Sequence, residues 1–202
     1  AGEKWDEIRR VITELIKCVE HLHSKGILHA DLKPLNLVRS EFAWQLIDLD
    51  AACEIGIDNV GYKSSTAYCP PEAIFHDENA DICVLRTQEN LYRLLSDDDE
   101  VSKQLLRAHP SFDIWSLGCI LYQLCNKDVL PLFQANRDDN VSSENSHIDS
   151  LKTLAEWADA TKSRKIDEIE DAKARNLLSR MLSKDPSRRP QLSRILQHPF
   201  IT

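Results

Sequence analysis

Four polar side chains near the start of the chain combine residue types suited to work on a charged group. Asp31, Lys33 and Asn36 lie in residues 29–36 (HADLKPLN), and Asp48 follows an apolar segment. A carboxylate can accept a proton, an ammonium group can stabilise negative charge, and Mg²⁺ prefers carboxylate and amide oxygens as ligands. Taken alone, Asp31 is more typical of a turn or a cap and Asp48 of a strand end, so the motifs around them have to decide.

A long amphipathic helix precedes these residues, and we expect it over residues 5–24 with Gly26 at its C-terminal cap. Short apolar pieces at 27–28, 37–38 and 44–47 are separated by polar residues, which predicts short strands around loops. The helix is indicated by apolar residues with the spacing of one helical face, namely Ile8, Val11, Ile12, Leu15, Ile16, Val19 and Leu22.

A second helix, at residues 113–125 (DIWSLGCILYQLC), is apolar on almost every face, which places it at the centre of the core. Another amphipathic pattern covers residues 174–182, and a last short helix is expected at 191–197. The predicted fold class is mainly α with a few short β-strands, in one compact unit.

Two stretches have the composition of surface insertions or loops. The first covers about residues 74–109 and contains the acidic run 97–100, and the second covers about 136–146 and is rich in Asn, Asp and Ser. The first stretch also contains apolar residues that favour some helix, namely Leu91, Leu94, Leu95, Leu105 and Leu106.

Further motifs follow in the order typical of one enzyme family. Residues 48–50 read DLD, 68–72 read YCPPE, 112–118 read FDIWSLG and 185–190 read DPSRRP. With HADLKPLN, they resemble the C-terminal lobe of a eukaryotic-type protein Ser/Thr kinase. In that family the catalytic loop is usually His-Arg-Asp-Leu-Lys-Pro-x-Asn, the magnesium motif Asp-Phe-Gly and the activation-segment end Tyr-x-Ala-Pro-Glu.

The resemblance implies roles for five residues. Asp31 would orient the attacking hydroxyl and accept its proton, and Lys33 would stabilise the transferring phosphoryl group, as in Ser/Thr kinases. Asn36 and Asp48 would hold Mg²⁺, and Val38 would form the floor under the adenine ring. The implied cofactors are ATP and Mg²⁺.

The resemblance also implies structural contacts. Glu72 would pair with Arg189, more than a hundred residues away in the sequence. Asp113 would accept backbone N–H groups of the catalytic loop, and Ser65 would hydrogen-bond the catalytic Asp and Lys. His29 is expected to be a packed structural histidine, and the histidines at 21, 23 and 198 are expected to be surface or core residues, not ligands.

The chain departs from the family pattern at three positions. Ala30 replaces the arginine whose charge is usually quenched by an activation-loop phosphate, so we expect activity that does not depend on phosphorylation of Ser64 or Thr66. Leu49 keeps apolar packing in place of Phe. Asp50 replaces a glycine, which tolerates backbone angles that Asp adopts less readily.

A larger departure precedes the predicted helix at 5–24. The Gly-rich loop, the strand lysine and its glutamate partner do not occur there. The resemblance therefore covers the C-terminal lobe only, with the β-rich N-terminal lobe expected elsewhere in a longer parent chain. The isolated piece is expected to be inactive or very weak.

Two function classes follow from these motifs. The first is a protein kinase domain fragment that transfers the γ-phosphoryl group of Mg-ATP to Ser or Thr hydroxyls of proteins. The second is a pseudokinase-like binding or scaffold module, favoured by Ala30, Asp50 and the missing N-terminal lobe. A small-molecule kinase that shares this lobe is a third option, against which Lys33-Pro34 and the Pro-Pro-Glu segment argue.

Composition excludes several other classes of protein. The net charge of −8 argues against a nucleic-acid partner and suits a basic substrate peptide. The six cysteines lack the close spacing of zinc sites and are expected to be reduced. No apolar run approaches the roughly 18 residues that cross a bilayer, so we expect an intracellular, cytoplasmic protein.

Overall fold

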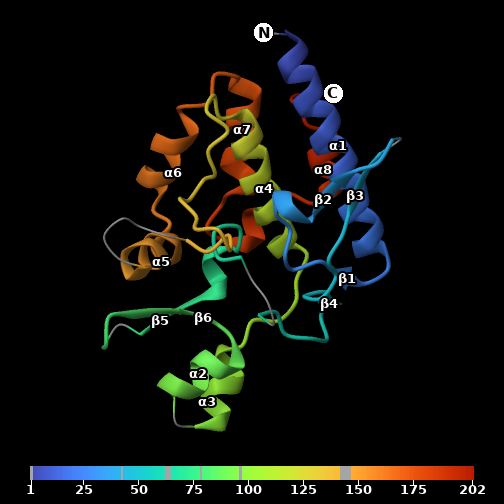
Figure 1. The fold of residues 1–202 in the computed structure, drawn as a ribbon. Helices are drawn as coiled ribbons and strands as arrows, with labels where there is room; N and C mark the ends of the chain where they lie inside the picture. Colours follow the sequence, from blue (N-terminus) through green and yellow to red (C-terminus); the bar gives the residue numbers. More distant parts are fainter. Residues whose placement is uncertain (1, 42, 62–64, 78, 96, 142–146) are drawn as a thin grey trace.

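The computed structural model describes residues 2–41, 43–61, 65–77, 79–95, 97–141 and 147–202 (Figure 1). Ser64, a candidate phosphorylation site, lies outside the described residues. Helices dominate, and each β-ribbon of the described part has two strands. The prediction of a mainly α fold with a few short strands is therefore confirmed. No helix in these ranges has the length and apolar character needed to cross a membrane.

Two helices form the centre of the fold. Helix α1 (Gly2–Ser24) buries the predicted apolar face against α4 (Ser111–Cys125). Gly26 follows α1 with φ +76°, and its N–H donates to His23 O at 3.0 Å, as expected of a C-terminal cap. Nearly all residues of α4 are buried, which confirms its predicted place in the core.

The C-terminal helices surround α4. Helix α7 (Ala172–Met181) packs on α4 where Gly118 lets the backbones approach, since a Cβ there would lie 2.9 Å from Leu182 Cδ2. Helix α8 (Leu192–Leu196) contacts α1. Helices α5 (His147–Glu156) and α6 (Asp159–Ile166) were not predicted. Only Ile166 of α6 is buried, so that helix has no apolar stripe to recognise.

Within the described residues, three antiparallel ribbons join the helices. Strand β1 (Ile27–Leu28) pairs with β4 (Cys53–Glu54), and β2 (Leu37–Arg39) pairs with β3 (Trp44–Leu46). The third ribbon joins β5 (Ile74–Asp77) and β6 (Ile82–Leu85). Short 3₁₀ helices start at prolines and lie at η1 (Pro34–Asn36), η2 (Pro71–Ala73) and η3 (Pro186–Arg188).

The stretch predicted as an insertion has regular structure. It contains the β5–β6 ribbon and two helices, α2 (Gln88–Leu94) and α3 (Asp98–Gln104), which lie at the end of the molecule opposite the start of α1 in Figure 1. The sequence left loop and partial helix open for this stretch, and the structure shows a helix that begins within the acidic run and is exposed there. Asp97 caps α3 by accepting the Glu100 N–H, and acidic residues are stable in a first helical turn.

Candidate active site

The segment with the catalytic-loop motif is anchored to the N-terminus of α4. The fully buried Asp113 accepts the backbone N–H of His29 through Oδ2 at 2.9 Å and that of Ala30 through Oδ1 at 3.0 Å. The predicted role of Asp113 is thus confirmed, and a helix N-terminus stabilises its carboxylate. His23 Nε2 lies 2.8 Å from the same Oδ2, a contact that the sequence did not suggest.

The backbone is unusual next to this anchor. Ala30 has φ +62°, which few residues other than glycine adopt. His29 is fully buried, and its Nδ1 accepts the Asp31 N–H at 3.3 Å, so Nε2 carries the proton and faces Ile47 O at 3.3 Å. His29 is therefore a packed structural histidine, as expected.

Asp31, Lys33 and Ser65 form one cluster. Lys33 Nζ donates to Ser65 Oγ at 2.7 Å and lies 3.4 Å from Asp31 Oδ2. Asp31 is buried, and its Oδ1 accepts the Ser65 N–H at 3.3 Å. The expected bridge through Ser65 is confirmed, and it joins the end of the activation segment to the catalytic-loop segment.

Asn36 and Asp48 lie at the same end of the β2–β3 ribbon, because Ile47 N donates to Asn36 O at 3.0 Å. The Asn36 amide nitrogen donates to Asp31 O at 2.8 Å and to Asp31 Oδ2 at 3.2 Å, so its side-chain oxygen is the atom suited to bind a cation. Asp48 is exposed, with φ +62°.

This donor set fits Mg²⁺. No cluster of three or more His, Cys, Asp or Glu side chains suited to a metal occurs in the described ranges. Mg²⁺ is commonly held by one or two protein oxygens together with substrate phosphates and water. An Asn oxygen and a carboxylate at one ribbon end match that pattern.

The neighbours of Asp48 explain how the substitutions in its motif are accommodated. The left-handed backbone angle falls on Asp48, and Asp50 has no positive φ, so glycine is not required at position 50. The side chains of Val38 and Leu49 are exposed, at 42% and 50%. An apolar surface therefore adjoins the polar cluster.

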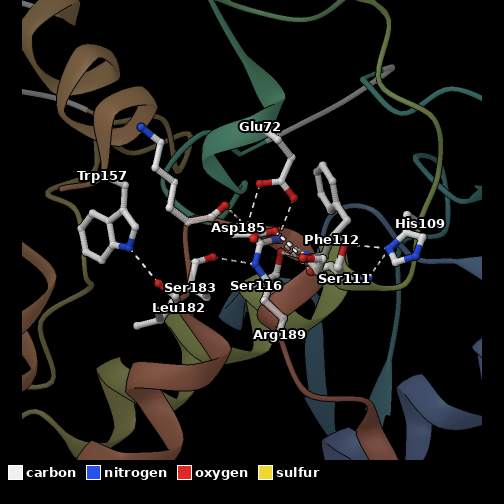
Figure 2. A network of polar contacts seen from close by, with 12 residues as sticks. Glu72, His109, Ser111, Phe112, Ser116, Trp157, Leu182, Ser183, Asp185 and Arg189 are labelled. Carbon is white, nitrogen blue, oxygen red and sulfur yellow. Dashed lines mark hydrogen bonds and ion pairs between the residues drawn. The ribbon is translucent and has the colours of Figure 1, made fainter. Parts of the chain in front are cut away.

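A second anchor holds the end of the activation segment, as Figure 2 shows. Arg189 makes a bidentate ion pair with Glu72 at 2.6 and 2.7 Å. Its other N–H groups donate to Ser111 O, Ser183 O and Lys184 O. All five donors of this guanidinium are thus used, and the predicted ion pair is confirmed.

The loop after α4 makes contacts that were missed. Asn140 Oδ1 accepts the Thr66 N–H at 3.4 Å and the Thr66 hydroxyl at 3.2 Å. Val141 N donates to Thr66 Oγ1 at 2.8 Å. Of residues 136–146, expected on the surface, 136–138 are exposed and Val141 is buried, while 142–146 lie outside the described residues. Their polar composition is typical of exposed loops, and spacing alone gave no sign of these contacts.

A large cavity of the described residues lies elsewhere. It has a volume of about 730 Å³ and lies beside the start of α4, where Arg107, His109 and Gln191 contribute to its wall. Asp31 and Lys33 do not line it. The polar cluster, not this cavity, contains the residues suited to catalysis.

Comparison with known proteins identifies the family. The model of the protein kinase domain matches residues 3–84 and 100–201. The chain belongs to the protein kinase domain family. Residues 85–99, outside the match, fall within the stretch predicted as an insertion.

Several kinases are similar along nearly the whole chain. The serine/threonine-protein kinase TOS3 of Saccharomyces cerevisiae is 29% identical over 98% of the chain, and PLK4 of Nematostella vectensis is 28% identical over 98%. The mouse dual specificity protein kinase TTK is 25% identical over 93%. The chain spans only 32%, 16% and 19% of these relatives, respectively.

Proposed function

We propose that this chain is the catalytic part of a protein Ser/Thr kinase, which transfers the γ-phosphoryl group of Mg-ATP to Ser or Thr hydroxyls of proteins. The observation that carries the proposal is the cluster in which Ser65 hydrogen-bonds both Asp31 and Lys33, whose Oδ2 and Nζ lie 3.4 Å apart. Asp113 fixes the same loop by accepting a backbone N–H from His29. A scaffold would have no chemical need for Asp31, Lys33, Asn36 and Asp48 together.

Each residue has a distinct task in this proposal. Asp31 orients the substrate hydroxyl and accepts its proton, because its carboxylate is fixed by Ser65 and Asn36. Lys33 stabilises negative charge on the phosphoryl group during transfer. Asn36 and Asp48 hold Mg²⁺ through their oxygens, and Val38 contacts the adenine ring. Mg-ATP, when bound, supplies the phosphoryl group and the metal charge that neutralises it.

We further propose that the chain corresponds to the C-terminal lobe and that an N-terminal lobe covers the face around the cluster. Four large apolar side chains are exposed there, on segments that flank Asp31 and Asp48, namely Leu35, Val38, Ile47 and Leu49. Exposed apolar groups close together in the sequence around the cluster favour a covering partner. All six cysteines are free, which supports the proposed cytoplasmic location.

Activity in this proposal is independent of activation-loop phosphorylation. Ala30 offers no cation that a phosphate would neutralise. The Thr66 hydroxyl is engaged with Asn140 and Val141, so it has a structural role. We expect Ser64→Ala to keep full activity in a protein kinase assay, and loss of activity in this variant would contradict the expectation.

The test uses the longest protein that contains this chain, incubated with γ-labelled ATP and a mixture of Ser/Thr and Tyr peptides. We expect label on Ser or Thr, dependent on Mg²⁺ and abolished by chelation. Label on Tyr alone would contradict the Ser/Thr assignment. Nucleotide binding without transfer would favour the pseudokinase-like binding module, to which Ala30 and Asp50 also point.

A further inference from the structure

Lys33 has a second acidic neighbour besides Asp31. Asp139, in the loop after α4, places Oδ2 3.7 Å from Lys33 Nζ. The side chains of both residues are largely covered, at 16% exposed for Lys33 and 17% for Asp139. The ammonium group therefore lies between two carboxylates from different parts of the chain.

The Asp139 carboxylate has little else to bind it. Its Oδ2 is buried and makes no hydrogen bond within the described part of the chain. Burial of a charged oxygen without a hydrogen bond is costly unless a charge of opposite sign offsets it. Lys33 provides that charge, whereas Asp31 Oδ2 also faces Asn36.

The backbone holds Asp139 in this position. Its φ is +58°, which Asp tolerates better than most residues. Its carbonyl accepts the Ala67 N–H at 3.1 Å, and its own N–H donates to Asn136 O at 3.2 Å. The loop is thus fixed to the activation segment, and the carboxylate is directed at Lys33.

We propose that Asp139 is a positioning residue for Lys33 in the phosphoryl transfer, an inference that rests on the proposed function. With Asp139 on its other side, Lys33 Nζ lies 3.4 Å from Asp31 Oδ2, which is longer than a tight charged hydrogen bond of about 2.7–2.9 Å. Without it, the ammonium would move onto Asp31 in a tight ion pair. Asp31 would then be less available to the substrate hydroxyl, and Lys33 less available to the phosphoryl group.

Asp139→Asn in the longest protein that contains this chain tests the inference. The amide is isosteric and tolerates the same backbone angle. We expect kcat to fall about tenfold, the effect of losing one interaction of ordinary strength, with the KM values for ATP and peptide changed less than about twofold. Asp138→Asn removes the same charge from an exposed neighbour and should leave all three constants unchanged.

A Lys33→Met background shows whether the effect acts through Lys33. We expect Asp139→Asn to lower the residual kcat there by less than about twofold, since effects of residues that act as a unit are not additive. An equal effect of Asp139→Asn and Asp138→Asn would overturn the inference. So would a tenfold loss that persists without Lys33.

Thermal unfolding of the wild type, Lys33→Met, Asp139→Asn and the double variant separates this inference from the proposed function. If the pair interacts, the Tm losses of Lys33→Met and Asp139→Asn should not be additive. Their sum should exceed the Tm loss of the double variant by about 2–4 °C. That coupling in a protein without transferase activity would support the pair and refute only the proposed function. Additive Tm losses would overturn the pairing itself.

Discussion

Replacement of Arg189 by leucine should destabilise the fold severely. The Arg189 side chain is fully buried, pairs with Glu72 and lies 5.0 Å from the Trp115 ring centroid. Leucine would leave the Glu72 carboxylate and three backbone carbonyls without these donors (Figure 2). Removal of one partner from a buried ion pair costs about 3–5 kcal/mol, a large share of the 5–15 kcal/mol that keeps a domain folded.

Urea unfolding followed by tryptophan fluorescence measures this loss, since Trp115 contacts the altered site. With a denaturant slope of about 2 kcal/mol/M, the midpoint should fall by roughly 1.5–2.5 M. The matched control is Arg188→Leu, because the Arg188 side chain is 80% exposed and its Asp185 contact is 3.5 Å. That surface pair should contribute less than about 1 kcal/mol. Equal midpoint shifts for the two variants would refute the reasoning.

Three further predictions concern the core and its acidic anchor. Gly118→Ala should lower the free energy of unfolding by about 1–3 kcal/mol in urea titrations, because its Cβ would meet Leu182. Asp113→Ala removes the acceptor of two buried N–H groups, so it should cost roughly 2–6 kcal/mol in the same assay, and Asp113→Asn should cost less. Burial raises the pKa of the Cys53 thiol from 9.0 to about 11. The folded protein therefore holds this proton more tightly than the unfolded chain, so the free energy of unfolding should fall as pH rises from 9.0 to about 11. In Cys53→Ala, the urea midpoint should fall less over the same pH range.

The helices that form the core could be predicted from sequence because their apolar residues are periodic. The apolar face of α1 and the uniformly apolar α4 are such cases. Helix α6 could not be found in this way, since it buries one residue and is otherwise polar. The acidic start of α3 could not be assigned from sequence, because the same residues suit a loop and a helix N-terminus.

Some contacts within the site could be predicted from the sequence, and others could not. Those tied to motif spacing, such as Glu72 with Arg189, were predicted and are present. The approach of Asp139 to Lys33 depends on how a polar loop folds back on the activation segment, and no local pattern specifies that. The His23 contact with Asp113 was missed for a similar reason, because a lone histidine near a helix end has many possible partners.

The most direct test of the proposed catalysis is the kcat of Asp31→Asn beside the wild-type protein, with ATP affinity measured in parallel. A general base contributes about 10²–10⁴-fold, so kcat should fall at least a hundredfold. ATP affinity should be unchanged, since Asp31 acts on the hydroxyl. Asp98→Asn, an exposed carboxylate in α3, should match wild type. A kcat of Asp31→Asn within about twofold of wild type would contradict the assignment of Asp31 as the base.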